Sequence, residues 1–297
     1  MSQEYIIFSD ISADIPADYA KKKGVMFLPM SYSLGDEQRI CDCIEPPEVL
    51  KAFYDGQRAG VLTRTTQISP YQYEESFKPY MSKGMSVLYL SLSSGLSSTY
   101  SSSLLAANDL NEKYKDTGAK LVSVDSLGAT VGMGMLIELA VKNREAGMSI
   151  EENAAWLEEN RLRIYHWFMV EDLMHLKRGG RISPATAVVG TALNIKPILK
   201  INTDGTLSAF EKKRGAKGAM NELLELYKAH STHEQGERVF VAHADAPDRA
   251  EYLCEQIREI NPSAGISCMM LSPIIGAHVG PGMCGIVHLA PEGLYRP

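Results

Sequence analysis

Hydroxyl side chains that could bind an anion gather in two segments of this 297-residue chain, of which the first reads TRTTQISP at residues 63–70. Ser69 begins a helix-start pattern: an N-cap, a first-turn proline and a capping-box partner, Gln72, three residues on. Thr65 and Thr66 have no such structural use. We therefore expect these two threonines to precede the helix and to face a cleft.

The second hydroxyl-rich segment, residues 91–100, reads SLSSGLSSTY and follows a short apolar run at 87–90. A strand that ends here, a loop containing Gly95 and a helix that opens near Ser97 would present backbone N–H groups and hydroxyls to an anion. Plain capping of the helix by Ser97 explains the same pattern, and spacing alone does not decide between the two. The segment lacks the lysine and spacing of a P-loop and the G-x-S-x-G of a nucleophile elbow.

A third candidate is the segment GAHVGPG at residues 276–282. Three glycines and a proline around His278 indicate close backbone approach and a fixed loop. A histidine held in this way is a candidate hydrogen-bond donor to a ligand. The other histidines, such as His166, His175 and His243, lie in or beside apolar segments, which favours structural roles.

Weaker signals occur in three further places. Asp10, Ser12 and Asp14 follow the first apolar run, where they either cap the next helix or touch a ligand. The glycines of residues 128–134 miss the dinucleotide spacing, and two of them are expected to allow close helix–strand packing. The Arg-Gly-Gly-Arg segment, 178–181, either binds an anion or reaches carbonyls at a helix end, and we favour the second interpretation.

The composition is that of a globular protein, with 45% hydrophobic and 22% charged residues. A net charge of -6 argues against a nucleic-acid partner. Five cysteines without paired spacing predict neither a disulfide framework nor a zinc site, and Cys41-Asp42-Cys43 has no second ligand pair nearby. No signal-peptide pattern and no run of about 18 apolar residues occur, so we expect a cytoplasmic protein without a transmembrane segment.

The elements that must position these residues alternate in the first half. Apolar runs predict strands at 5–8, 25–30, 87–90, 121–124 and 165–170. Helical spacing occurs at 16–23, 98–114, 131–146 and 150–163, the last with a capping box of Ser149 and Glu152. This alternation predicts a three-layer α/β domain with a mostly parallel sheet.

The second half has a different pattern. Strands at 196–201 and 207–212 flank a turn signal at 202–205, which predicts a hairpin. Helix, strand, helix, strand and strand follow at 216–230, 238–244, 247–260, 265–271 and 285–289. We therefore predict an α+β domain with a mixed or antiparallel sheet, and two domains at 1–165 and 166–297.

Taken together, these segments resemble the DegV family, whose members include the fatty-acid-binding subunits of bacterial fatty acid kinase. The match runs nearly end to end. It rests on FSDISADIP (8–16), TRTTQISP (63–70), LSSGLSSTY (92–100), VDSLGATVGMG (124–134), LKRGGRIS (176–183), KPIL (196–199), TDGTL followed by KKR (203–214) and GAHVGPG (276–282).

The resemblance implies a DegV-like fold with a long-chain fatty acid held at and between the two domains. It implies a non-catalytic bacterial protein that sequesters the acyl chain and presents the carboxylate to the catalytic subunit of a fatty acid kinase. The acyl phosphate formed there feeds phospholipid synthesis. We expect no cofactor other than the bound fatty acid, no metal, and only transient contact with a membrane.

The resemblance also implies roles for particular residues. Those that match the carboxylate-binding positions are Thr65, Ser97 and His278. Secondary candidates, at the head group or facing the kinase, are Thr66, Ser94, Gly95 and Arg214. Three residues depart from the family pattern: Thr66 stands for serine, Ile68 for proline and Ser98 for glycine. These departures bear on loop shape and ligand choice.

Three rival functions remain at this stage, of which a structural scaffold is the least favoured, because the glycine-flanked His278 would then have no purpose. A hydrolase or phosphotransferase could use Ser97 or Ser94 with His278, but it needs an acid to orient the histidine, and no clear candidate exists. A carrier of another anionic lipid would use the same residues as a fatty-acid carrier. Acyl-chain length and saturation depend on packed side chains and cannot be derived from the sequence.

Overall fold

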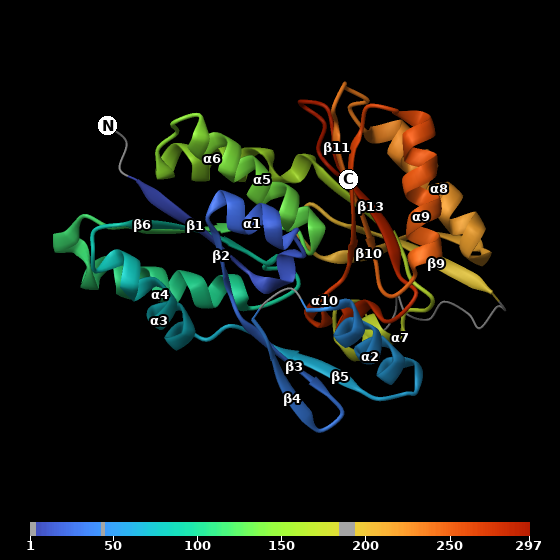
Figure 1. Ribbon diagram of the computed structural model, residues 1–297, viewed down its shortest axis with the longest axis horizontal. Coiled ribbons are helices and arrows are strands. Elements are labelled where there is room, and N and C mark those ends of the chain that lie inside the picture. Colours follow the sequence, from blue (N-terminus) through green and yellow to red (C-terminus); the bar gives the residue numbers. More distant parts are fainter. Residues whose placement is uncertain (1–3, 43–44, 184–193) are drawn as a thin grey trace.

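The computed structural model of the chain describes residues 4–42, 45–183 and 194–297 (Figure 1). Cys43, the second member of the C-x-C pair, lies outside the described residues. Three sheets organise these described residues, and the two larger sheets correspond to the two halves of the sequence.

The first sheet is entirely parallel and has the strand order β2-β1-β6-β7. Its strands are β1 (Tyr5–Asp10), β2 (Val25–Leu28), β6 (Ser86–Ser91) and β7 (Leu121–Asp125). The helices that pack on this sheet are α1 (Ala17–Lys23), α3 (Pro70–Met81), α4 (Thr99–Lys113), α5 (Val131–Glu145) and α6 (Ile150–Asn160). Helices α3 and α4 lie on one side of the sheet and α5 and α6 on the other (Figure 1), which confirms the predicted three layers.

Both predicted capping boxes are present. Ser69 N donates to Gln72 Oε1 at 2.9 Å, and Gln72 N donates to Ser69 Oγ at 3.4 Å. The equivalent bonds between Ser149 and Glu152 are 2.8 and 3.2 Å. Each pair satisfies two backbone N–H groups that a helix start leaves without partners, so α3 and α6 begin where the sequence predicts.

The second large sheet has the order β10-β9-β8-β13-β11-β12. Its strands are β8 (Ile164–Met169), β9 (Ile195–Ile201), β10 (Leu207–Arg214), β11 (Arg238–His243), β12 (Gly265–Met270) and β13 (Cys284–Leu289). All neighbours are antiparallel except β11 and β12, so the predicted mixed sheet is confirmed. The β9–β10 hairpin turns at Gly205, whose φ of +79° favours glycine.

Alternate residues of the six-stranded sheet belong to two different cores. Trp167 and Met169 of β8 pack in a cluster with α8 (Gly215–His230) and α9 (Pro247–Ile260). Phe168, between them, belongs to the larger cluster that contains the parallel sheet. Because successive strand side chains point to opposite faces, one face of this sheet closes its own domain and the other packs against the first half.

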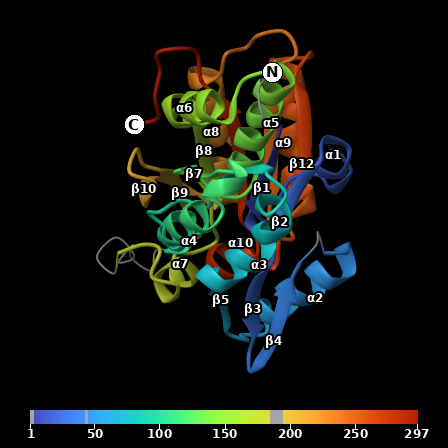
Figure 2. The ribbon, with the colours of Figure 1, turned by 90° about the vertical axis from the view of Figure 1, so that its left-hand side faces the viewer.

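A third, small sheet was not predicted. It has the antiparallel order β4-β3-β5 and forms a lobe with α2 at the bottom of both ribbon views (Figures 1 and 2). Its elements are β3 (Met30–Leu34), β4 (Glu37–Cys41), β5 (Thr63–Thr66) and α2 (Pro47–Arg58). The prediction of one strand over 25–30 was therefore wrong, since β2 ends at Leu28 and β3 begins at Met30. Pro29, which has no N–H to give to a ladder, separates them.

The chain crosses back to this lobe near its end. Helix α10 (Pro273–Val279) follows β12 in sequence but contacts β3, β5 and α2, and also α7 (Met174–Arg178). Short 3-10 turns complete the described elements: η1 (Ile11–Ala13), η2 (Lys115–Thr117) and η3 (Arg161–Arg163).

The prediction of a loop around His278 is wrong for the first part of the segment, because residues 276–279 end helix α10. Gly280, at φ +74°, then follows as the C-cap.

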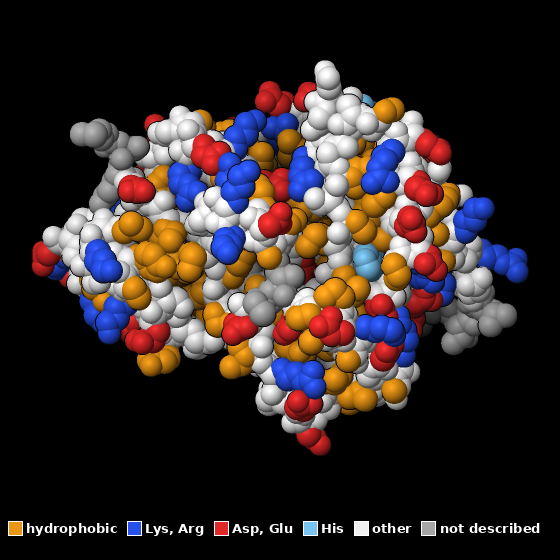
Figure 3. All heavy atoms as spheres, viewed as in Figure 1, with side chains coloured by type: hydrophobic (Ala, Val, Ile, Leu, Met, Phe, Trp, Pro, Cys, Tyr) orange, Lys and Arg blue, Asp and Glu red, His pale blue; other side chains and the backbone are white. Residues whose placement is uncertain are grey.

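The outer surface carries mixed charge. On the face shown in Figure 3, Lys and Arg side chains lie among Asp and Glu side chains. Within the described residues, no helix combines the length and the apolar character needed to cross a membrane.

Candidate functional site

A cavity of about 330 Å³ lies between the parallel sheet and the inner face of the six-stranded sheet. Most of its lining is apolar, including Leu96, Phe168, Leu176, Ile201, Met283 and Val287. Its position beyond the carboxyl ends of parallel strands is where α/β sheets bind ligands. An apolar cavity of this size with a few polar groups is typical of a small-molecule site.

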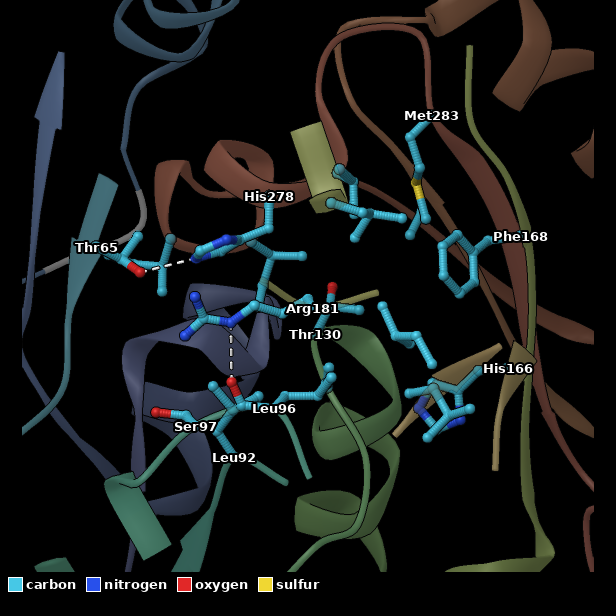
Figure 4. A pocket seen from close by; sticks show the side chains of 18 of the residues that line it. Thr65, Leu92, Leu96, Ser97, Thr130, His166, Phe168, Arg181, His278 and Met283 are labelled. Carbon is cyan, nitrogen blue, oxygen red and sulfur yellow. Dashed lines mark hydrogen bonds between the residues drawn. The ribbon is translucent and has the colours of Figure 1, made fainter. Parts of the chain in front are cut away.

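The polar groups of the cavity gather at one end. Thr65 comes from β5, Ser97 from the loop before α4, and His278 from the last turn of α10. Figure 4 shows these three with Arg181 on one side of the cavity, while Phe168, Met283 and His166 lie on the other. The structure thus brings together the three residues that the sequence analysis placed at a carboxylate.

The central contact of this end joins residues 213 positions apart: Thr65 Oγ1 lies 2.8 Å from His278 Nε2 (Figure 4). Burial and, to a smaller extent, the positive charge of Arg181 lower the pKa of His278 to about 4. The imidazole is therefore neutral at pH 7 and carries one N–H. Its Nδ1 is buried and has no hydrogen-bond partner among the described residues.

Arg181 is the residue of this end that the sequence analysis underrated. Its Nε donates to the Leu96 carbonyl at 3.0 Å and its Nη1 donates to the Gly179 carbonyl. These bonds confirm the favoured structural interpretation, but the side chain also lines the cavity and is the one charged group among the described lining residues. The paired glycines of the Arg-Gly-Gly-Arg segment could have indicated that Arg181 belongs to this site, because Gly179 lets the backbone approach the His278 ring. A Cβ there would lie 2.4 Å from Nδ1.

Ser97 both ends a loop and faces the cavity. Its Oγ accepts from Thr99 N at 3.2 Å and lies 2.8 Å from Thr99 Oγ1. The N-cap of α4 is Ser98, which makes no side-chain capping bond, so plain capping by Ser97 is not what the structure shows. Ser97 lies one residue before the cap and lines the cavity beside the first turn of α4.

The structure separates the secondary candidates into two groups. Thr66 lines the cavity, whereas Ser94, Gly95 and Arg214 are not part of its lining. Thr65 and Thr66 belong to strand β5 rather than to a free segment before the helix. Close packing explains the glycine at position 95, because a Cβ there would lie 2.5 Å from the Gly205 backbone. Arg214 is exposed at the end of β10, so its kinase-facing role stays a prediction.

His166 was expected to be a structural core residue, and it is buried, but it also lines the cavity. A Cβ on Gly132 would fall 1.8 Å from His166 Nε2, and one on Gly134 would fall 3.1 Å from the Ala13 carbonyl. The predicted close helix–strand packing is therefore confirmed for Gly132, which faces strand β8, whereas Gly134 faces the η1 turn and not a strand. Burial lowers the pKa of His166 to about 3, so the ring is neutral.

The acidic residues Asp10, at the end of β1, and Asp14 hold the loops of the site and do not line the cavity. Asp10 accepts from Leu92 N at 3.0 Å and caps η1 through Ser12 N at 3.2 Å. Asp14 accepts from Thr130 Oγ1 at 2.7 Å and from Ser272 N at 2.9 Å. Burial raises the pKa of Asp14 to about 6. These bonds favour the structural alternative for both aspartates.

No acidic side chain is present among the described residues of the cavity lining. His278 Nδ1 has no carboxylate partner there, and the hydrogen bonds of Ser97 Oγ go to Thr99. A serine nucleophile needs a base in hydrogen-bond reach and usually a third group that orients it. The described residues also contain no group of three or more His, Cys, Asp or Glu that could hold a metal ion.

Fold and cavity together define a two-domain α/β protein whose halves enclose an apolar cavity with a polar end. The model of the DegV family, described as uncharacterised proteins, matches residues 5–290. A DegV domain-containing protein of Clostridium perfringens is 37% identical over 287 residues, which cover 97% of this chain and 98% of the relative. The chain belongs to the DegV family.

Solved structures share the fold. A DegV family protein from Thermus thermophilus, described for its fatty acid binding, is 28% identical with a TM-score of 0.83, over 97% of this chain and 100% of the other. The fatty acid kinase B3 protein of Streptococcus pneumoniae, solved loaded with linoleic acid, has a TM-score of 0.83 over 97% of this chain and 100% of the other. At 23% identity, this structural likeness shows the shared fold alone.

Proposed function

We propose that this protein binds a long-chain fatty acid, with the acyl chain in the apolar cavity and the carboxylate at Thr65, Ser97, His278 and Arg181. The observation that carries the proposal is the cavity itself, which is apolar along most of its lining and polar at one end. Burial of each methylene contributes about 0.8 kcal/mol. A buried carboxylate is costly unless it is paired, and this end offers hydroxyls, an imidazole and a guanidinium.

Binding is tested with protein purified gently and extracted for mass spectrometry of its lipids. We expect a co-purified fatty acid in roughly stoichiometric amount, and a several-fold lower amount in the Leu96→Trp variant, because a larger side chain would fill part of the cavity. Leu105→Trp is the matched control, since Leu105 is 60% exposed on α4 outside the cavity lining. Empty protein that takes up no fatty acid in titration would contradict the proposal. If another anionic lipid co-purifies instead, that lipid is the ligand and the fatty-acid assignment is wrong.

We also propose that the bound carboxylate is presented to a separate kinase, without catalysis or a cofactor in this chain. The motif resemblance supports this step, and so does an open groove that shares Thr65, Arg181 and His278 with the cavity and adds Arg64 and Arg178. A partner that enters this groove would meet the head-group end directly. A cytoplasmic location stays a prediction from the sequence.

Presentation is tested with loaded protein, ATP and a fatty acid kinase catalytic subunit. We expect acyl phosphate, trapped as the hydroxamate with hydroxylamine, in an amount that depends on this protein. Thr65→Val should lower the yield, because it weakens the head-group site. Fatty acid that stays bound and unphosphorylated would remove the presentation step and leave the carrier function intact.

A further inference from the structure

Asp14 is a buried carboxylate outside the cavity lining that nevertheless joins two walls of the cavity. It follows η1 with φ +45°, a left-handed backbone that is uncommon outside glycine, asparagine and aspartate. Its Oδ2 accepts from Thr130 Oγ1 at 2.7 Å, and its Oδ1 accepts from Ser272 N at 2.9 Å. These partners lie 116 and 258 residues away in the sequence, so the carboxylate is a long-range link.

The Ser272 end of this link is the start of α10, the helix that carries His278. Ser272 is the N-cap of α10, and its own side chain makes no capping bond. Asp14 accepts the N–H of this residue, as the second member of a capping box does. It therefore holds the start of a seven-residue helix that contributes Ile274, His278 and Val279 to the cavity lining.

Tyr54 of α2 holds the residue before Ser272. Its hydroxyl donates to the Leu271 carbonyl at 2.9 Å, while Leu271 N donates to the His243 carbonyl of β11 at 2.8 Å. Gly276 lets α10 lie against the tyrosine, because a Cβ there would fall 2.4 Å from the Tyr54 hydroxyl oxygen. The junction between β12 and α10 is thus bonded to both domains and to the small lobe.

The Thr130 end of the link is the start of α5. Thr130 is the N-cap of α5 and lines the cavity (Figure 4), with φ +50° and ψ -137°. Such a backbone is strained for a β-branched residue and persists only where its surroundings hold it. The Thr130 hydroxyl donates to Asp14, so the same carboxylate that holds α10 also holds this wall.

The two ends of α10 differ in how they are held. Near its end, Gln57 and Thr63 each donate to a carbonyl of α10, at 3.1 and 3.2 Å, so the loss of one bond leaves the other. At its start, the Ser272 N–H is bonded to Asp14. We therefore expect a larger displacement of His278 when Asp14 is replaced than when Thr63 is.

The head-group contact depends on where α10 lies. His278 Nε2 is 2.8 Å from Thr65 Oγ1, and the two residues belong to different elements. A hydrogen bond tolerates only a few tenths of an ångström, so a shift of about 1 Å in α10 would break this contact.

We propose that Asp14 is a positioning residue of the fatty-acid site, which places His278 opposite Thr65 through α10 and fixes the cavity wall at Thr130. Tyr54 supports the same junction from the lobe. The inference rests on the proposed fatty-acid binding, but the placement of the His278 ring can be measured without a ligand.

The proposal is tested by titrating the delipidated natural chain, Asp14→Gly and Asp14→Asn with oleic acid. Glycine and asparagine both adopt the left-handed backbone of residue 14, so neither substitution adds strain there. Asp14→Gly removes both bonds and should lower the affinity on the order of tenfold. Asp14→Asn should restore most of the affinity, because its amide oxygen can accept from Ser272 N and its amide N–H can donate to Thr130 Oγ1.

Two further variants control for lost stability. Ser149→Ala removes the capping box of α6, outside the cavity lining, and should leave the affinity unchanged. Tyr54→Phe keeps the aromatic ring and removes a single bond, so its affinity should fall by a smaller factor than that of Asp14→Gly. Tyr54→Phe also tests the proposal if Asp14→Gly does not fold.

A second readout is heteronuclear NMR of the His278 ring in delipidated protein. The Nε2 signal reports the bond to Thr65 Oγ1, so it should move in Asp14→Gly and in Tyr54→Phe. It should keep its position in Asp14→Asn and in Ser149→Ala.

An unmoved Nε2 signal in Asp14→Gly would overturn the proposal, as would an unmoved signal in Tyr54→Phe if the glycine variant does not fold. Equal losses of affinity in Asp14→Gly and Ser149→Ala would overturn it as well, since lost stability would then explain both. If the natural chain binds no fatty acid, the proposed function is wrong, and the NMR comparison still decides whether Asp14 positions His278.

Discussion

Replacing Thr65 with valine is expected to lower the affinity for a long-chain fatty acid by about 10- to 100-fold, because one hydrogen bond to a charged group is worth about 1.5–3 kcal/mol. Valine has nearly the shape of threonine, so β5 and the cavity should keep their packing. The measurement is a titration of delipidated protein with fatty acid.

The size of this effect follows from where the hydroxyl lies. Thr65 Oγ1 is 2.8 Å from His278 Nε2, at the end of the cavity that also holds Arg181. The variant would leave a carboxylate with one donor fewer in a low-dielectric site, where an unsatisfied charge is costly. It would also leave a second nitrogen of the half-buried His278 ring without a partner, in addition to Nδ1.

Thr63→Val is the matched control. Thr63 is on the same strand and also reaches α10, through a 3.2 Å bond from its Oγ1 to the Ala277 carbonyl, but it is not in the cavity lining. If Thr65 acts on the ligand, Thr63→Val should bind fatty acid within about twofold of the natural chain. Equal losses in both variants would mean that the threonines only position α10, and no loss in Thr65→Val would remove this residue from the site.

Acidification from pH 7 to pH 5 is expected to lower the free energy of unfolding by about 2 kcal/mol for each of His166 and His288. Burial lowers the pKa of each ring from 6.5 to about 3 in the folded chain. The folded state therefore keeps these rings neutral while the unfolded chain protonates them. Stability is fully present above pH 6.5 and is lost as the pH falls from there towards 3.

Buried carboxyls work in the opposite direction, because burial raises the pKa of both Asp10 and Asp14. The pKa of Asp14 is raised from 3.8 to about 6, so its contribution is fully present below pH 3.8 and is lost as the pH rises through 6. Acidification from pH 7 to pH 5 should therefore raise the contribution of Asp14 to the free energy of unfolding by about 1 kcal/mol. The two histidines together exceed this gain, so a net loss is expected.

His288→Phe tests whether the buried His288 ring causes part of this loss of stability at low pH. The His288 ring stacks on Tyr165 at 5.6 Å between centroids and meets Tyr227 at 5.5 Å, contacts that a phenyl ring can keep. Urea unfolding at both pH values should show a loss on acidification that is smaller by about 2 kcal/mol than in the natural chain. An unchanged pH dependence in His288→Phe would show that the acid sensitivity arises elsewhere.

Local patterns were sufficient for much of the fold. The capping boxes at Ser69 and Ser149 and the turn before Gly205 involve residues within a few positions of each other, so their geometry can be derived from spacing. The parallel and mixed sheets followed from the alternation of elements. The small β3–β5 sheet could not be predicted in this way, because its strands are short and its outer members, β4 and β5, are edge strands with little burial.

The sequence by itself determined the family, the two sheet types and the candidates Thr65, Ser97 and His278, because these depend on residue order and short-range chemistry. The tertiary structure decided which hydroxyls share a cavity. It joined Thr65 to His278 across 213 residues, left Ser94, Gly95 and Arg214 outside the lining, and added Arg181 and His166. The physical reason is that α10 leaves the second domain and packs on β3 and β5 of the first. No local pattern encodes that contact, since it depends on how buried surfaces from both halves fit together.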